Sequence, residues 1–204
     1  MKIEDKVKEI KQSFKLYMDG EVARSMRDKG LCYFVNWGIQ LSRLKEMATQ
    51  YGKDADLALL LWRDNTRECK ILAALIMPPE ARTRQLADYW VSGMTTQEIA
   101  EICSLHLFQY IRNALPMAQE WLSSNDDNTR ICACNVISRV VMKGQYPQIE
   151  DVKKIAENLV AAANNGGVGL RRAATNCLTR IVDCGDEYST VVNDVIKKNS
   201  TEPF

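Results

Sequence analysis

The feature that most constrains the fold of this chain is an internal repeat with an offset of 41 residues. The segment at 129–141, TRICACNVISRVV, aligns without gaps on the segment at 170–182, LRRAATNCLTRIV. Apolar residues recur in both copies at three- and four-residue spacing, which is typical of amphipathic helices. Another helical segment precedes each copy, at about 113–124 and 148–164, so the repeat unit is predicted to be a pair of helices. The identical pairs are Arg130/Arg171, Ala133/Ala174, Asn135/Asn176, Arg139/Arg180 and Val141/Val182.

The polar identities carry the argument for a true repeat. Two amphipathic helices of similar composition can look alike by chance, and helix packing explains why Ala and Val recur. Packing gives no reason for two Arg and one Asn to recur on the polar face, whereas a shared exposed surface does. Helix pairs of about 40 residues are the units of HEAT and armadillo arrays. We therefore predict an all-α fold, a right-handed α-α superhelix of HEAT-like pairs, as one domain over residues 1–204 with its clearest repeats at about 113–144 and 148–185.

Few residues in this chain break helices. It has ten Gly and five Pro in 204 residues, and the stretch 53–77 contains neither. This scarcity argues against β-sandwich, collagen-like and low-complexity chains. Residues able to accept hydrogen bonds from the first N–H groups of a helix precede the apolar runs, and they are Asp54, Thr95 or Thr96, Asp126 or Asn128, and Asp186.

The net charge of +1 conceals an uneven distribution. Residues 130–180 contain eight cations and three anions. If the second helices of successive pairs line a concave surface, their cations converge on one groove suited to a phosphate backbone. The alternative is that these are ordinary solvated helix faces. The cations predicted to face this groove are Arg130, Arg139, Lys143, Arg171, Arg172 and Arg180.

Residues with catalytic or metal-binding chemistry are sparse. The single histidine, His106, lies in an apolar run, so we expect a packed helix residue and neither a metal site nor a Ser-His-Asp triad. Seven cysteines, an odd number with no CxxC pair, indicate reduced thiols in a cytoplasmic protein. No signal peptide or membrane-spanning stretch is expected. The apolar spacing around Trp62 and Trp121 assigns both side chains to the core.

Four short motifs suggest a family. They are the turn at Gly38-Ile39, the pair Leu61-Trp62, Arg67-Glu68 leading into ILA, and the basic helix that starts near Arg130. Over roughly residues 22–188, their order and spacing resemble the DNA alkylation repair family of HEAT-like-repeat alkylpurine DNA glycosylases. The resemblance implies a monomer that holds double-stranded DNA and hydrolyses the N-glycosidic bond of an N3- or N7-alkylated purine without flipping the base. It also implies that the reaction needs no metal or other cofactor.

The resemblance also suggests site residues. The family's Trp-x3-Asp motif falls on TTQEIAEIC, which places Gln97 at the aromatic position and Glu101 at the catalytic carboxylate. A phosphate-binding arginine corresponds to Arg130, and a second aromatic position corresponds to Asn176. The chain therefore keeps a carboxylate and a basic groove but lacks two aromatics that would pack on the sugar. Three functions stay open: a DNA glycosylase, a noncatalytic module that binds DNA structures or lesions, and a protein-binding HEAT scaffold.

Overall fold

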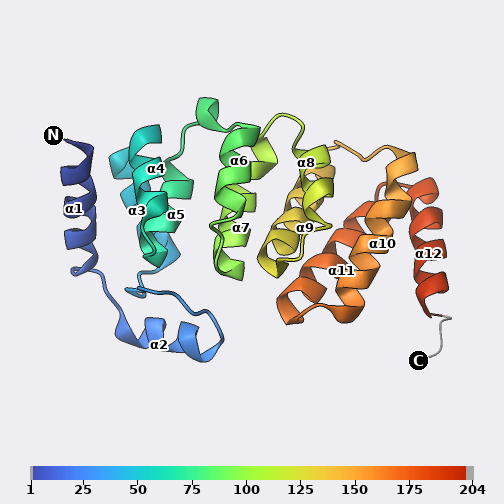
Figure 1. Cartoon of the computed structure of the whole chain (residues 1–204), viewed down its shortest axis with the longest axis horizontal. Helices are drawn as coiled ribbons and strands as arrows, with labels where there is room; N and C mark the ends of the chain where they lie inside the picture. Colours follow the sequence, from blue (N-terminus) through green and yellow to red (C-terminus); the bar gives the residue numbers. More distant parts are fainter. Residues whose placement is uncertain (1, 201–204) are drawn as a thin grey trace. The chain divides into compact units, whose positions relative to one another are not determined.

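The computed structural model describes residues 2–200, which form twelve α-helices and two 3-10 helices (Figure 1). Within these residues the extended pairing is limited to an isolated bridge between Val35 and Thr66. The all-α prediction is confirmed. The helices are α1 (Ile3–Phe14), α2 (Gly20–Asp28), α3 (Leu41–Tyr51), α4 (Ala55–Arg63), α5 (Arg67–Ile76), η1 (Pro79–Ala81), α6 (Arg84–Val91), α7 (Gln97–His106), η2 (Phe108–Tyr110), α8 (Ala114–Trp121), α9 (Asp127–Val141), α10 (Ile149–Asn165), α11 (Val168–Val182) and α12 (Asp186–Ser200).

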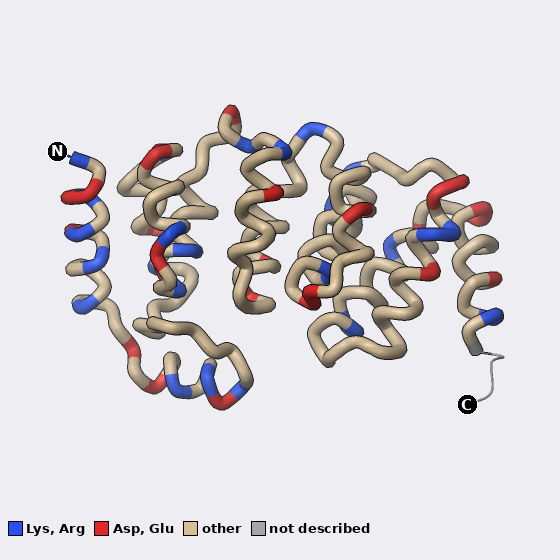
Figure 2. The backbone as a smooth tube through the Cα atoms, in the orientation of Figure 1, with Lys and Arg blue, Asp and Glu red and all other residues tan. Residues whose placement is uncertain are grey.

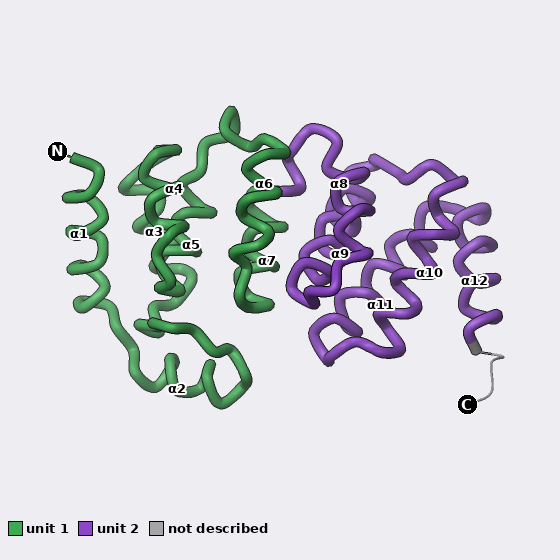
Figure 3. Tube along the Cα trace, viewed as in Figure 1, with its two compact units in different colours: residues 1–107 green, residues 108–204 purple. Residues whose placement is uncertain are grey.

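The chain divides into two compact units, Met1–Leu107 and Phe108–Phe204 (Figure 3). Both copies of the repeat fall in the second unit. There α8 packs on α9, α10 packs on α11, and α9 packs on α11. The first residues of α9 and α11, Asp127 and Val168, are 41 positions apart, and so are their last residues, Val141 and Val182. The offset found in the sequence is therefore also the offset between two stacked helices.

Side-chain caps set several helix starts. Asp54 Oδ1 accepts a hydrogen bond from Leu57 N at 3.0 Å, and Asp126 Oδ2 accepts one from Thr129 N at 2.7 Å. Thr96 caps α7 in the same way. Each such cap satisfies an N–H group that has no partner within its own helix. The predicted starts at Asp54, Thr96 and Asp126 are confirmed.

Small apolar side chains let the helices of the second unit pack closely. Ala133 and Ala174 are fully buried and occupy the same position in α9 and α11. Three cysteines of this unit, Cys132, Cys134 and Cys177, are also buried, and all seven cysteines of the chain are free thiols. Burial raises the pKa of Cys177 to about 12, so this thiol stays protonated and behaves as an apolar side chain. Trp121 is buried as predicted and meets Phe108 edge to face, with ring centroids 5.3 Å apart.

Two tryptophans form the centre of the first unit. The Trp62 and Trp90 rings stack with centroids 4.2 Å apart and an interplanar angle of 2°. Lys70 Nζ lies 4.3 Å from the centroid of the Trp62 ring and donates a hydrogen bond to Trp62 O at 3.1 Å. The core assignment of Trp62 is confirmed, and Trp90 is a packing residue because its side chain is fully buried.

A buried ionic network fixes the loop before α3. Arg67 binds Glu98 through two hydrogen bonds, from Nε at 2.8 Å and from Nη2 at 2.7 Å, and donates through Nη1 to Glu68 at 3.0 Å and to Ile39 O at 2.8 Å. The Glu68 carboxylate in turn accepts from the backbone N–H groups of Trp37 and Ile39. The network joins the predicted motif at Arg67-Glu68 to the turn at Gly38-Ile39.

Gly38 is required at this turn for two reasons. Its φ of 71° lies in the left-handed region that favours glycine, and a Cβ atom there would overlap the carbonyl oxygen of Asp19. A larger residue at this position would therefore displace the loop from the network.

Candidate nucleic-acid interface

The repeat places matching polar side chains along one surface of the second unit. A hollow of about 340 Å³ lies between α9 and α11 and is called here the α9–α11 groove. Three repeat-equivalent pairs make up most of its lining, and it contains two arginines and no acidic residue. Its lining residues are Asn135, Ser138, Arg139, Met142, Asn176, Thr179 and Arg180.

Hydrogen bonds to the helix backbone orient several of these side chains. Ser138 Oγ donates to Cys134 O at 2.8 Å, Thr179 Oγ1 donates to Thr175 O at 3.1 Å, and Asn135 Nδ2 donates to Ile131 O at 3.0 Å. The hydroxyl and amide oxygens that remain can accept hydrogen bonds, while the two guanidinium groups supply donors and charge.

The two arginines of the groove are differently paired. Arg180 lies 3.7 Å from Asp183, and both side chains are about half exposed. Within residues 2–200, Arg139 has no carboxylate within ion-pair distance. An exposed pair such as Arg180–Asp183 is worth little, so it leaves the arginine available to a ligand. The groove therefore offers two guanidinium groups to an anion.

Lys143 adds a third cation beside the groove. It follows the end of α9, and its Nζ lies 4.0 Å from the centroid of the Tyr110 ring. Burial and the positive charge of Arg139 lower the pKa of Lys143. Because the two cations repel each other, an anion placed between them would relieve an unfavourable interaction.

The other predicted cations lie on different parts of the helix surface. Arg172 precedes Asn176 by one turn and shares its face of α11. Arg171 is five residues before Asn176, which places it about 140° further around the helix. Arg130 occupies the equivalent position in α9, where it lies 3.6 Å from Asp127. Of the predicted DNA-binding residues in this unit, the structure brings Arg139 and Asn176 together in the hollow, with Arg172 on the same face.

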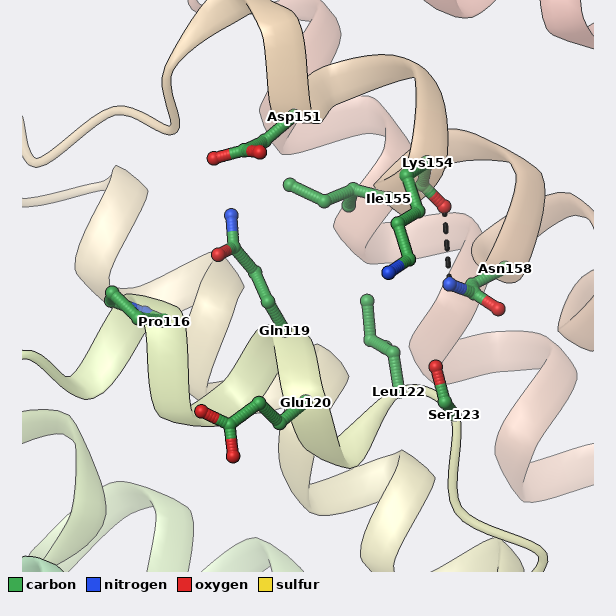
Figure 4. Close-up of a pocket in the computed structure, with 9 residues that line it drawn as sticks. All are labelled: Pro116, Gln119, Glu120, Leu122, Ser123, Asp151, Lys154, Ile155 and Asn158. Atoms are coloured by element: carbon green, nitrogen blue, oxygen red, sulfur yellow. Dashed lines mark hydrogen bonds between the residues drawn. The ribbon is translucent and has the colours of Figure 1, made fainter.

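A second hollow, between α8 and α10, has a different character (Figure 4). It has a volume of about 260 Å³ and is called here the α8–α10 hollow. In Figure 4, Lys154 points into the space between the two helices while Asp151 and Glu120 lie at its edges. One cation and two anions give this surface no positive excess. Its lining residues are Pro116, Gln119, Glu120, Leu122, Ser123, Asp151, Lys154, Ile155 and Asn158.

The predicted catalytic residue Glu101 and the predicted DNA-binding residue Gln97 lie in the first unit, on α7. Gln97 Nε2 donates to Glu101 Oε1 at 2.8 Å, and Glu101 is exposed. Their neighbour Glu98 is held by Arg67 and by the Tyr33 hydroxyl. Burial by itself would raise the pKa of Glu98, but the hydrogen bonds and charge of Arg67 bring it below its usual value. The structure gives Glu101 a polar partner on its own helix, Gln97.

The buried ionic network of Arg67, Glu68 and Glu98 was not predicted from the sequence. The signal was present, because RECKILAALI places two charged residues at the start of a helix that is otherwise largely apolar. Such charges are almost never fully buried unless they are paired.

The described part of the chain offers neither a metal-binding cluster nor a membrane-spanning helix. No group of three or more His, Cys, Asp or Glu side chains there is arranged to hold a metal ion. No helix within residues 2–200 combines the length and apolar character needed to cross a bilayer.

Comparisons with known proteins agree with this architecture. Among curated proteins, none matches the sequence. In fold, the chain is similar to a solved structure from a new family of proteins related to the HEAT-like repeat DNA glycosylases with affinity for branched DNA structures. The TM-score is 0.74 at 14% sequence identity, and the match covers 93% of this chain and 80% of that chain. This likeness confirms the predicted class of HEAT-like helix pairs.

A match between the sequence and a family model shows the family of this chain. Residues 10–166, most of the chain, match the family described as DNA alkylation repair enzymes. The match includes α9, which supplies one wall of the α9–α11 groove, and α7, which carries Gln97 and Glu101. The chain belongs to the DNA alkylation repair enzyme family.

Proposed function

We propose that this chain is a DNA-binding protein of DNA repair that holds the phosphate backbone in the α9–α11 groove. The observation that carries the proposal is the recurrence of Asn135 and Arg139 as Asn176 and Arg180 across two stacked helices. Repeated donors at one register suit a ligand that is itself a repeating polyanion. Packing alone does not account for this recurrence.

The distribution of charge within the second unit supports the same conclusion. Within residues 130–180, α9 and α11 carry five cations and no anion, whereas α10 carries two cations and all three anions (Figure 2). The positive potential is therefore concentrated on the helices that form the groove. A protein-binding scaffold with the same fold would need no such segregation.

The kind of DNA is also part of the proposal. The structurally similar protein belongs to a family with affinity for branched DNA structures. Phosphate contacts of the kind available in the groove position a duplex without reading its sequence. We therefore propose that the groove takes double-stranded DNA, including branched forms, without strong sequence preference.

A matched pair of variants tests the groove. Replacing Arg139 and Arg180 together by Ala should weaken duplex binding about tenfold or more at moderate salt and reduce the slope of log affinity against log salt by roughly two. Lys154→Ala, which removes a cation from the α8–α10 hollow, should leave both quantities nearly unchanged. Equal losses in both variants would contradict the groove assignment. If the wild-type protein retained no DNA at low salt, the DNA-binding proposal itself would fail in favour of a protein-binding scaffold.

Base excision is the second candidate function, and the carboxylate on α7 supports it. Glu101 is exposed and oriented by Gln97, so it could stabilise positive charge that develops on a deoxyribose. Catalysis through it would be slow, since Gln97 and Asn176 replace aromatics that would hold the sugar. Any excision would therefore be confined to cationic N3- or N7-alkylated purines, which are already good leaving groups.

Base release should be measured in single turnover on duplexes with N7-methylguanine or N3-methyladenine. Glu101→Gln removes the charge while nearly preserving shape, and should abolish any release above the spontaneous rate. Equal release by wild type and variant would exclude Glu101 as the catalytic group. Release by neither would leave a noncatalytic protein that binds DNA structures or lesions.

A further inference from the structure

A smaller hollow continues the α9–α11 groove. It has a volume of about 190 Å³ and is called here the Tyr146 hollow. It shares Met142 and Arg180 with the groove, so the two are contiguous on the surface of the second unit. Its lining residues are Val141, Met142, Tyr146, Arg180, Asp183 and Cys184.

Four of the six residues that line the Tyr146 hollow have largely apolar side chains, and the hollow is open to solvent. Met142 is 65% exposed and Tyr146 is 48% exposed, although both have large apolar side chains. Met142 is the C-cap of α9, and Tyr146 lies in the loop before α10. An aromatic ring beside a cationic groove is the arrangement that proteins use to stack single-stranded bases while holding the phosphates.

The Tyr146 ring is held in place by its neighbours. Pro147 follows it directly, which restricts the backbone of Tyr146 to extended conformations. The ring meets Tyr188 edge to face, with centroids 6.1 Å apart, and the Tyr188 hydroxyl donates to Pro147 O at 3.0 Å. A ring that is already ordered loses little conformational entropy when a ligand stacks on it.

The electrostatics of the Tyr146 hollow favour a base over a phosphate. Asp183 lines it, and the carboxyl-terminal ends of α9 and α11 carry partial negative charge. A phosphate is therefore less favoured in the hollow, where Asp183 offsets Arg180, than in the groove, where Arg139 and Arg180 line the surface without an acidic residue. A nucleotide can meet both conditions when its phosphate lies in the groove and its base lies against Tyr146.

We propose that the Tyr146 hollow binds an unpaired DNA base, stacked on the Tyr146 ring, next to a duplex whose backbone occupies the α9–α11 groove. The base must be unpaired, since a paired base offers only its edges and keeps both faces within the helix stack. This inference rests on the proposed DNA binding by the groove and adds the recognition of a duplex end or branch point that has an unpaired nucleotide.

The test compares two DNAs that share one duplex sequence. One is blunt, and the other has a short single-stranded extension that contains the fluorescent base 2-aminopurine. Wild type should bind the extended DNA at least about fivefold more tightly, because stacking on one aromatic ring is typically worth that much or more. It should also quench the emission of 2-aminopurine. Tyr146→Ala should lose both the preference and the quenching, and Tyr146→Phe should keep both.

Two controls separate this proposal from the one on which it rests. Tyr89→Ala removes a tyrosine of similar exposure, 50%, from α6. It should change neither the preference for the extended DNA nor the quenching of 2-aminopurine. Arg139→Ala should weaken binding of both DNAs by the same factor. Circular dichroism of Tyr146→Ala should match wild type, because the side chain removed is half exposed.

The outcomes are distinct. If Tyr146→Ala keeps the preference and the quenching, or if Tyr146→Phe loses them as fully as Ala does, stacking on this ring is overturned. Equal binding of both DNAs by wild type without quenching also overturns it, while leaving the groove proposal intact. Binding of neither DNA by wild type overturns the groove proposal and, with it, this inference.

Discussion

The two units of this protein use charge in opposite ways. In the first unit, Arg67 and Glu68 are 2% and 0% exposed and are bound to each other and to Glu98. In the second unit, Arg139, Arg171 and Arg172 have no carboxylate partner among the described residues, and the two arginines on α11 are exposed. Buried charges require partners within the fold, whereas exposed charges are available to a ligand. Stability effects are therefore expected in the first unit, and binding effects in the second.

The largest expected effect is the loss of Arg67. Arg67→Met leaves two carboxylates in or beside the core without their cation, and should lower the free energy of unfolding by about 3–5 kcal/mol. The change is measured by urea denaturation, with near-UV circular dichroism reporting on the stacked Trp62 and Trp90. Arg63→Ala, an exposed arginine on α4, should change the free energy by less than about 0.5 kcal/mol. Similar values for both variants would show that burial of the network does not contribute to stability.

The acid stability of the first unit should depend on Glu98. The pKa of Glu98 is lower in the folded protein than its usual value of 4.5, so its stabilising contribution is present above pH 4.5 and is lost as pH falls through the folded pKa. Glu98→Gln, a mimic of the protonated acid, should therefore be less stable than wild type at pH 7. The difference in free energy of unfolding between the two proteins should become smaller as pH is lowered below 4.5. The free energy of unfolding measured between pH 7 and 3 tests this, with Glu101→Gln on the exposed side of α7 as the control. A difference in free energy of unfolding that stays constant with pH would contradict the expectation.

A smaller effect separates two adjacent arginines of the second unit. Arg172 shares the face of α11 that lines the groove, and Arg171 points about 140° away from Asn176. Arg172→Ala should weaken duplex binding roughly three- to tenfold at moderate salt, and Arg171→Ala should weaken it clearly less. Neither variant should change the free energy of unfolding by more than about 0.5 kcal/mol. The same loss of affinity in both variants would show that DNA contacts the protein beyond the groove. A loss of stability would contradict the expectation that charges of the second unit affect binding and not stability.

The smallest effect concerns Lys143 and Tyr110. Lys143→Met removes a cation that lies over an exposed ring, and exposed pairs of this kind contribute about 0.5–1 kcal/mol. Thermal unfolding should therefore shift by no more than a few degrees, while affinity for duplex DNA falls modestly through the lost charge. Tyr110→Leu, which removes the aromatic ring but keeps the cation, should show the stability loss alone. If both variants lose affinity equally, the Tyr110 ring itself contacts DNA.

The repeat was predictable in detail because it depends on local patterns. Apolar spacing, caps such as Asp126 and the polar identities between the copies all lie within one or two helices, so the sequence predicts α9 and α11 with their offset. The predicted groove could not be settled in this way. All the predicted cations lie on α9 or α11 or directly after α9, as expected. Small rotations of each helix about its axis decide which of these side chains share a face. Arg139 and Asn176 line the hollow, and Arg130 and Arg171 do not.

The sequence by itself determined the all-α class, the helix-pair repeat, the family and the concentration of cations in residues 130–180. These features arise from periodicity and composition along the chain, which need no distant contacts to be recognised. Tertiary structure alone decided the pairing of Arg67 with Glu98 across 31 positions, the stacking of Trp62 on Trp90, and the meeting of the α9–α11 groove with Tyr146. Each of these joins side chains from different helices, and their distance and orientation depend on how the helices pack. Residue type and spacing along one segment do not contain that information.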